Sequence, residues 1–101
     1  MNDEAAVSAL AALAQPTRLA AYRALVQAGP EGLMVGALRE QLDVPAATLT
    51  AHLHVLRRAG LVDDERDGRV IHCRANFARM NALLSYLTDN CCGGKPCGPN
   101  C

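Results

Sequence analysis

Residues 44–74 read VPAATLTAHLHVLRRAGLVDDERDGRVIHCR, and this stretch decides the fold. Three leucines recur at helical spacing in its first half, namely Leu49, Leu53 and Leu56. This spacing predicts a helix with one buried face, which Gly60 ends. Beyond Gly60 the period changes, and the pair Asp67-Gly68 between two β-capable runs predicts a hairpin turn whose two central residues have positive φ. The stretch is therefore a helix followed by a charged, two-stranded hairpin.

Apolar periodicity predicts further helices before this unit. Residues 4–14 form an alanine-rich helix that is apolar over much of its surface and needs partners on more than one face. Pro16 opens the next helix, which ends at Gly29. Four of its side chains are expected to point inward: Leu19, Tyr22, Leu25 and Val26. Residues 33–42 form a short helix, and the turn after it leads into the leucine-striped helix, as in a helix-turn-helix.

Composition limits the class of protein. The chain has 101 residues, half of them hydrophobic, which indicates one small globular domain. A final helix over residues 76–88 has more apolar surface than so small a monomer can cover, so we expect a dimer. The sequence shows no secretory signal and no run long enough to span a membrane, which predicts a cytoplasmic protein without a membrane partner.

The net charge and the distribution of charge point to different functions. Ten basic residues balance ten acidic ones, which does not suggest a nucleic-acid binder. Six arginines nevertheless lie on or near the helix and hairpin: Arg57, Arg58, Arg66, Arg69, Arg74 and Arg79. Acidic residues interleave with them, so the hairpin alone could equally be a solvated charged surface. The combination of helix and hairpin favours DNA binding.

The runs LAQPTRLAAYRALVQAG, GLMVGALREQLDV, TLTAHLHVLRRAGLV and ERDGRVIHCRAN resemble, in this order, the ArsR/SmtB family of metal-responsive repressors. The resemblance covers the chain up to about residue 89. It implies a mainly α winged helix-turn-helix with a small β-hairpin, in which the hairpin lies between the fourth and fifth helices. It also implies a homodimer formed by the first and last helices, with residues 1–90 as the DNA-binding and dimerisation domain. Its partner is then double-stranded operator DNA.

The resemblance assigns DNA contacts to the leucine-striped helix. Small alanines let such a helix sit deep in the major groove, and threonine hydroxyls can donate to a phosphate or a base. His52 and His54 can reach the DNA backbone, although a histidine near an apolar stripe can equally be hydrogen-bonded in place. Arg66 and Arg69 flank the expected turn and can reach a phosphate or the minor groove. The full set is Ala46, Ala47, Thr48, Thr50, Ala51, His52, His54, Arg57, Arg66 and Arg69.

Two sensing sites found in relatives are missing from this chain. Where arsenic-responsive relatives have two cysteines in the short third helix, this sequence has Met34 and Gly36. No histidine follows His72, so the zinc site that some relatives form on the last helix is missing too. Cys73 alternates with Ile71 on the second strand and is expected to be a buried, inert thiol.

Residues 91–101 form a tail with four cysteines: Cys91, Cys92, Cys97 and Cys101. Glycines and prolines between them let the backbone fold sharply, and clustered thiolates select soft ions. A three-sulfur pyramidal site suits As(III) or Sb(III), whereas four sulfurs suit tetrahedral zinc or cadmium. The C-terminal arsenite sites of some ArsR repressors resemble Cys91, Cys92 and Cys97, and Cys101 is either spare or a substitute for Cys97.

The predicted function is a repressor released from its operator when arsenite or antimonite binds these cysteines, with derepression of an arsenic-resistance operon. No organic cofactor is expected. Two alternatives share the DNA-binding half: a zinc- or cadmium-responsive repressor, and a thiol-redox sensor in which tail cysteines form a reversible disulfide. A tail whose thiols merely oxidise is a further possibility. An enzyme with a cysteine nucleophile is disfavoured, because no histidine lies near the tail in the sequence.

Overall fold

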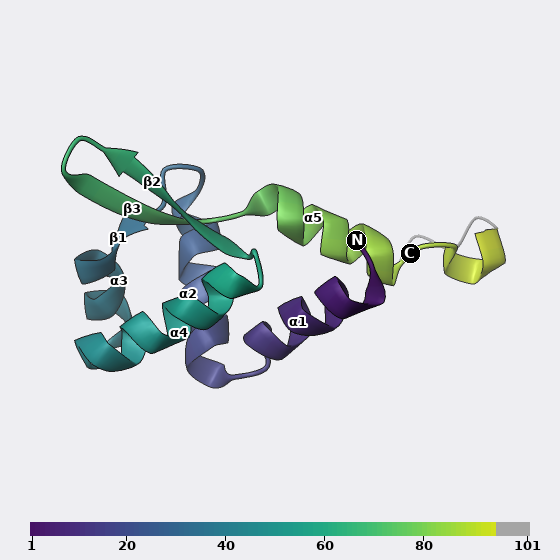
Figure 1. Cartoon of the computed structure of the whole chain (residues 1–101), viewed down its shortest axis with the longest axis horizontal. Helices are drawn as coiled ribbons and strands as arrows, with labels where there is room; N and C mark the ends of the chain where they lie inside the picture. The colour runs from purple at the N-terminus through teal and green to yellow at the C-terminus, as the bar shows by residue number, and fades with distance from the viewer. Residues whose placement is uncertain (95–101) are drawn as a thin grey trace.

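The computed structural model describes residues 1–94 and has five helices, three short strands and one 3₁₀ turn in this part of the chain (Figure 1). The helices are α1 (Asp3–Leu13), α2 (Pro16–Ala28), α3 (Val35–Leu42), α4 (Ala46–Arg58) and α5 (Phe77–Leu87). The strands are β1 (Leu33–Met34), β2 (Val62–Asp67) and β3 (Val70–Ala75), and the 3₁₀ turn η1 is Cys91–Gly94. The architecture confirms the predicted winged helix-turn-helix.

The core is built almost entirely from leucine and alanine. The leucine stripe of α4 is buried as predicted, because Leu49, Leu53 and Leu56 are each at most 1% exposed. They pack in one cluster with Leu25 of α2 and Leu38 of α3. Each fully buried leucine contributes about 1.5–3 kcal/mol relative to an exposed one. This packing fixes the angle between the two helices of the helix-turn-helix.

Side-chain caps divide the helices into two groups. The N-termini of α1, α2 and α5 are capped by Asn2, Gln15 and Asn76, whose side-chain oxygens accept backbone N–H bonds of 2.8 to 3.0 Å. The helices of the helix-turn-helix, α3 and α4, have no side-chain cap, and Pro45 precedes α4. Their first-turn N–H groups thus lack the partner that a capping side chain supplies.

The small sheet corrects two predictions. Leu33 and Met34 were expected to begin a helix, but they form β1, which pairs with β3 through Leu33 opposite Cys73. The sheet therefore has three antiparallel strands in the order β1-β3-β2, rather than two. The cause is a left-handed Gly32 (φ 69°) whose backbone lies directly against the carbonyl of Cys73, which turns the chain onto the sheet edge before α3 can start.

The hairpin turn lies one residue later than predicted. Asp67 pairs with Val70, so the two loop residues are Gly68 and Arg69, not Asp67 and Gly68. Only Gly68 has positive φ (65°), at the first central position, where a type II′ hairpin turn needs glycine. Asp67 consequently belongs to β2, and Arg69 lies at the tip of the wing.

The inward face of α2 is narrower than expected. Tyr22 and Leu25 are buried as predicted, but Leu19 and Val26 are 44% and 39% exposed. Ala21 is fully buried, because α1, α3, α4 and β3 all pack on one stripe of α2. A small side chain lets these elements approach closely and leaves Leu19 and Val26 outside the contact.

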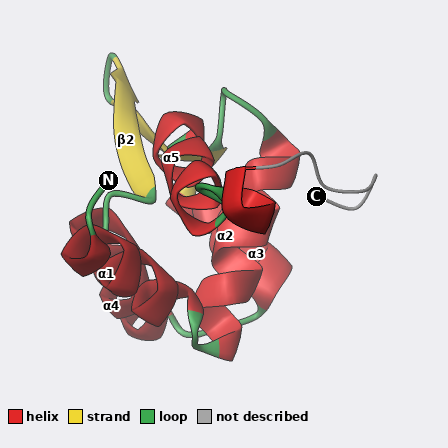
Figure 2. Ribbon diagram, turned by 90° about the vertical axis from the view of Figure 1, so that its right-hand side faces the viewer, coloured by secondary structure: helices red, strands yellow, loops and turns green. Residues whose placement is uncertain are grey.

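The helices α1 and α5 contact each other at the end of the molecule opposite the tip of the wing (Figure 1), which is the side that faces the viewer in Figure 2. The alanine face of α1 packs into the domain through Ala6, Ala9 and Ala12. Val7 on α1 and Leu84 and Leu87 on α5 are 64%, 54% and 52% exposed. As predicted, both helices have apolar surface that the monomer leaves uncovered. Within residues 1–94, no helix has the length and apolar character needed to cross a membrane.

Candidate nucleic-acid interface

The outer face of α4 presents small and polar side chains. Six of the predicted DNA contacts are exposed on it: Ala46, Ala47, Thr48, Thr50, Ala51 and His54. The Thr50 hydroxyl donates to the Ala46 carbonyl at 2.9 Å, which leaves its lone pairs free to accept. A helix with so little bulk on its outer side can enter a major groove without steric conflict.

His52 lies apart from this exposed set. It is half-buried, and its Nδ1 lies 3.3 Å from Nη1 of Arg18 on α2. Of the two roles considered for His52, the structure places it in an internal hydrogen bond between helices. Arg18 was absent from the predicted site, and no sequence pattern could indicate a contact between residues 34 positions apart.

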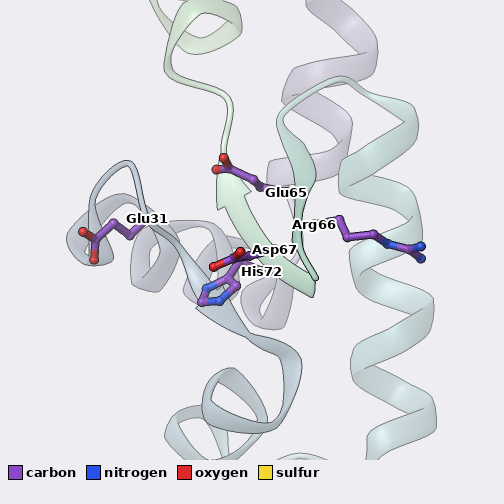
Figure 3. Close-up of a pocket in the computed structure, with 5 residues that line it drawn as sticks. All are labelled: Glu31, Glu65, Arg66, Asp67 and His72. Atoms are coloured by element: carbon purple, nitrogen blue, oxygen red, sulfur yellow. The ribbon is translucent and has the colours of Figure 1, made fainter. Parts of the chain in front are cut away.

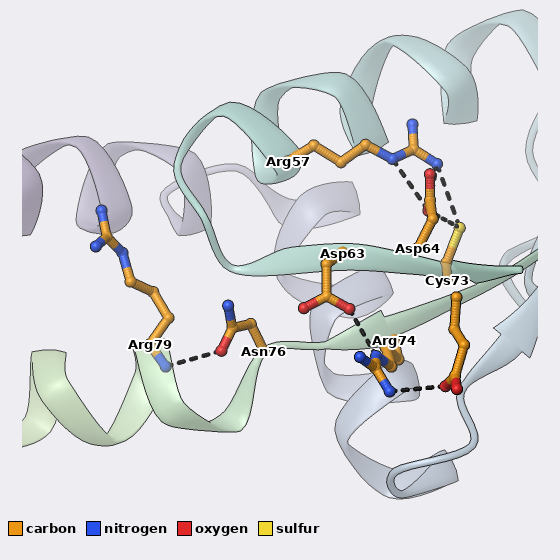
Figure 4. Close-up of polar contacts among 8 residues, drawn as sticks. Arg57, Asp63, Asp64, Cys73, Arg74, Asn76 and Arg79 are labelled. Carbon is orange, nitrogen blue, oxygen red and sulfur yellow. Dashed lines mark hydrogen bonds and ion pairs between the residues drawn. The ribbon is translucent and has the colours of Figure 1, made fainter.

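Arg57 connects the end of α4 to the wing (Figure 4). Its guanidinium donates to Asp64 Oδ1 from Nη2 at 3.1 Å and from Nε at 3.3 Å, and Nη2 also contacts Cys73 Sγ at 3.3 Å. The pair is partly exposed and contributes about 0–1 kcal/mol. Arg57, predicted to contact DNA, thus has its charge balanced by Asp64 in the free protein.

Cys73 is fully buried in β3, as predicted. Burial raises the pKa of its thiol above the ordinary value, and the hydrogen bond that the thiol donates to Asp64 at 3.4 Å raises it further. Arg57 acts in the opposite direction but does not outweigh these effects. The thiol therefore stays protonated at neutral pH, which makes it a poor nucleophile and a poor metal ligand.

The two faces of the wing carry different charge. The register pairs Asp64 with Cys73 and Arg66 with Ile71, which places these four residues on one face. Because Arg57 of α4 contacts Asp64 and Cys73, this face is the one beside α4. Figure 3 shows Arg66 extending towards α4, whereas Asp67 and His72 lie on the other side of the wing.

The acidic residues of the opposite face are largely paired. Arg74 donates to Asp63 at 2.6 Å and to Glu65 at 2.7 Å (Figure 4), and these bonds, chiefly the one to Asp63, raise the pKa of Arg74. In the described part of the chain, neither Arg66 nor Arg69 has an ion-pair partner. The neutral net charge therefore conceals two unpaired arginines on the wing, namely Arg66 on the face beside α4 and Arg69 at the tip.

A pocket of about 410 Å³ opens at the wing (Figure 3). Five residues line it: Glu31, Glu65, Arg66, Asp67 and His72. Among residues 1–94, no three histidine, cysteine or acidic side chains are grouped so that they could hold a metal ion.

The predicted sensing cysteines lie beyond α5. Cys91 and Cys92 begin the η1 turn, only a few residues after α5 ends at Leu87, and Cys92 has a left-handed backbone (φ 56°). The chain thus bends sharply where the cysteines begin. Cys97 and Cys101 lie outside the described residues, so their predicted part in the site is a matter of sequence alone.

One further basic residue adjoins the interface. Arg39 is exposed on α3, and its Nε donates to the Val44 carbonyl at 3.3 Å, next to the start of α4. The first helix of a helix-turn-helix crosses the DNA backbone, so an exposed arginine here can meet a phosphate. The sequence prediction omitted it, although its position directly after the buried Leu38 could have indicated it.

An exposed, small-residue helix presented by a packed partner helix, beside a wing with unpaired arginines, defines a DNA-binding protein of the winged helix-turn-helix class. Comparison with known proteins agrees with this class. Residues 13–65 match a family model described as a helix-turn-helix domain. The structure is similar to an ArsR-like transcriptional regulator from Rhodococcus sp. RHA1, with a TM-score of 0.71 and 30% identity over 83% of this chain and 76% of that one. The chain therefore belongs to the ArsR family of winged helix-turn-helix transcriptional regulators, which are DNA-binding proteins.

Two other similarities bear on function. The biofilm growth-associated repressor of Agrobacterium fabrum is 40% identical over 78 residues, which are 77% of this chain and 64% of that relative. The chain thus matches somewhat under two-thirds of that relative's length. A homodimeric winged helix-turn-helix DNA-binding domain from Mycobacterium bovis shares the fold, with a TM-score of 0.66 and 24% identity over 94% of each chain.

Proposed function

We propose that this protein is a transcriptional repressor that binds operator DNA as a homodimer. The observation that carries the proposal is the continuous surface formed by the exposed face of α4 and the wing face that bears Arg66. The N-termini of α3 and α4 have no side-chain cap, so their first-turn N–H groups can donate to phosphate oxygens. The similarity to a relative named as a repressor supports the direction of control.

Dimerisation follows from the uncovered apolar side chains of α1 and α5. Val7, Leu84 and Leu87 are each more than half exposed, which is costly for large aliphatic groups unless a partner covers them. A twofold axis beside α1 and α5 would direct both wings outward, so the two α4 helices can enter successive major grooves about one turn apart. The homodimeric relative supports this assembly.

The proposed inducer is As(III) or Sb(III), held by thiolates of the tail. In the reduced protein, Cys91 and Cys92 with Cys97 would supply three soft ligands from one chain, which fits a pyramidal trivalent metalloid. The tail leaves from the end of α5, where Leu84 and Leu87 are exposed. A ligand that ties the tail at this end therefore acts next to the proposed dimer interface, and a coupling of about 1–3 kcal/mol would weaken DNA binding by about 5–150-fold.

The test uses a fluorescein-labelled duplex that the wild-type protein recovers from a random-sequence library. Sodium arsenite, zinc chloride and cadmium chloride are titrated separately into the reduced complex, and anisotropy reports release. Arsenite is expected to release the duplex, and single Cys→Ser changes at Cys91, Cys92 and Cys97 are expected to abolish the response. Cys73→Ser is the matched control. Its buried thiol lies in the wing and not in the tail, so arsenite should still release the duplex from this variant.

The outcomes separate the levels of the proposal. If the wild-type protein recovers no duplex, the DNA-binding function is wrong. If zinc or cadmium releases the duplex and arsenite does not, the repressor stands and the inducer is wrong. If peroxide alone releases it in metal-free buffer, the thiol-redox alternative replaces the metalloid site.

A further inference from the structure

Arg18 is the side chain that joins three helices at one point. It lies near the start of α2, and its Nε donates to the Ala12 carbonyl at 2.7 Å, with Nη2 at 3.5 Å from the Ala11 carbonyl. Its Nη1 lies 3.3 Å from Nδ1 of His52 on α4. One guanidinium thus contacts the end of α1 and the middle of α4 at the same time.

The contact to α1 satisfies groups that need a partner. The last carbonyls of a helix have no N–H donor within the helix, and α1 has no basic residue of its own in its last turn. Arg18 supplies a donor to the Ala12 carbonyl, whereas the Ala11 carbonyl also accepts the Ala14 N–H, and its guanidinium places a positive charge at the negative end of the helix dipole. The Arg18 backbone is held as well, because its N–H donates to the Gln15 side chain at 2.8 Å. The Arg18 backbone is thus held within α2, while its guanidinium is bound to the end of α1.

The contact to α4 fixes the histidine ring. A guanidinium can only donate, so Nδ1 of His52 must accept and the neutral ring carries its proton on Nε2. His52 lies directly before the buried Leu53, so a rotation of α4 about its buried stripe would carry the ring away from Arg18. This rotation is the movement that would turn Thr48 and Ala51 away from a groove.

We propose that Arg18 is a positioning residue for operator binding: through His52 it holds α4 at a fixed orientation to the end of α1. Because α1 also presents the exposed Val7 at the proposed dimer interface, the geometry of that interface sets the orientation of both α4 helices. Arg18 itself contacts no DNA in this role. The inference rests on the proposed DNA-binding function and adds to it the residue that connects the dimer to the recognition helix.

The test compares Arg18→Met with Arg23→Met in the full chain. Methionine keeps most of the aliphatic stem and removes the guanidinium, and Arg23 is an exposed arginine on the same helix. We expect Arg18→Met to bind the selected duplex about tenfold more weakly, within the range typical of coupled sites. The dependence of affinity on salt and the dimer dissociation constant should stay unchanged, because the substitution removes neither a phosphate ligand nor an interface side chain. Arg23→Met should bind like the wild type.

A double-mutant cycle with His52→Ala tests whether Arg18 affects DNA binding through its contact with His52. The loss of affinity caused by Arg18→Met should largely disappear in the His52→Ala background, since the contact is already broken there. ¹⁵N spectra of the histidine rings give a readout that general destabilisation would not move. In the wild type, His52 should show the neutral tautomer with its proton on Nε2, and Arg18→Met should convert it to a mixture of tautomers.

Several results would overturn the inference. They are equal affinities of the two methionine variants, a shallower salt dependence for Arg18→Met, or additive effects in the cycle. If Arg18→Met does not fold by circular dichroism, His52→Ala decides, and wild-type affinity for that variant rejects the proposal. Failure of the wild type to recover any duplex instead rejects the proposed function, so the two failures are distinguishable.

Discussion

At the scale of single residues, three glycines separate three effects that an added methyl group can have. An added Cβ at Gly32 would collide with the carbonyl of Cys73, and Gly32 also has positive φ. Gly29 has positive φ (82°) but open space around it, whereas Gly36 has neither constraint and lies in α3. An alanine at Gly32 therefore tests collision together with backbone strain, one at Gly29 tests backbone strain alone, and one at Gly36 tests helix propensity.

The stability of the three alanine variants should follow this order. Gly29→Ala should cost about 1–3 kcal/mol of backbone strain, because φ 82° with ψ −165° is a conformation that essentially only glycine adopts. Gly32→Ala should cost more than that, because β3 must also move. Gly36→Ala should stabilise the protein by about 0.5–1 kcal/mol. Urea unfolding followed by circular dichroism measures all three, and a Gly32→Ala protein as stable as Gly29→Ala would show that the close approach to β3 does not exist.

The buried thiol of Cys73 and the buried hydroxyl of Tyr22 should lower the stability of the fold at alkaline pH. Burial raises the pKa of the Cys73 thiol and of the Tyr22 hydroxyl above their ordinary values. The unfolded chain therefore ionises before the folded one as pH rises, so stability is full below the ordinary pKa and is lost above it. For Cys73 the loss begins above about pH 8.5, and for Tyr22 above about pH 10.

The expected result is a pH dependence that single substitutions flatten. Cys73→Ala should lower stability at neutral pH by loss of packing, but should reduce the decline above about pH 8.5, which is at most about 1.4 kcal/mol per pH unit for one group. Tyr22→Phe should leave neutral stability unchanged or raise it, because the hydroxyl is buried with no partner among the described residues. Urea unfolding at stepwise higher pH checks both, and parallel curves for wild type and Cys73→Ala would contradict the buried thiol.

At the scale of elements, the wing is predicted to grip phosphates. Arg66→Ala together with Arg69→Ala should weaken duplex binding, with a salt dependence shallower by about 0.9 for each phosphate that the wing no longer neutralises. Both arginines are exposed and unpaired within residues 1–94, so little stability should be lost. Anisotropy at several salt concentrations gives the slope, with Arg23→Ala as the charge control. A slope identical to that of the wild type would place the wing away from the DNA backbone.

The elements also show what sequence reasoning can and cannot reach. The α4 stripe was predictable because three leucines at helical spacing leave little choice of buried face. The strand β1 was not, because two residues carry no period and pair only through contacts distant in sequence. The turn was displaced by one residue because an Asp-Gly pair fits either side of the loop, and only the register of β2 and β3 decides between them.

The candidate site divides in the same way. The exposed residues of α4 and the tip of the wing follow from local pattern and resemblance. The pairing of Arg57 with Asp64, and the contact of Arg18 with His52, depend on how separate elements pack, which no local pattern contains. The metal assignment for the tail stays a prediction, since Cys97 and Cys101 lie outside residues 1–94.

At the scale of the whole molecule, the dimer can be separated from the fold. Leu84→Glu and Leu87→Glu place charges on side chains that are already half exposed in the monomer, so each subunit should remain folded. Sedimentation velocity should show a monomer, and duplex affinity should fall steeply because two half-sites are no longer held together. Met34→Glu is the control, since Met34 is 48% exposed on β1, at the sheet and away from α5. A Leu84→Glu, Leu87→Glu protein that remains a dimer would place the interface elsewhere.

The missing side-chain caps of α3 and α4 have a consequence for the free protein. Amide hydrogens in the first turns of these two helices should exchange with solvent faster than those in the first turns of α1, α2 and α5, whose capping residues protect them. A bound duplex would supply phosphate oxygens in place of the absent side chains, and the difference in exchange should then vanish. The DNA would in this way supply the N-terminal hydrogen bonds that no side chain of the protein supplies to α3 and α4.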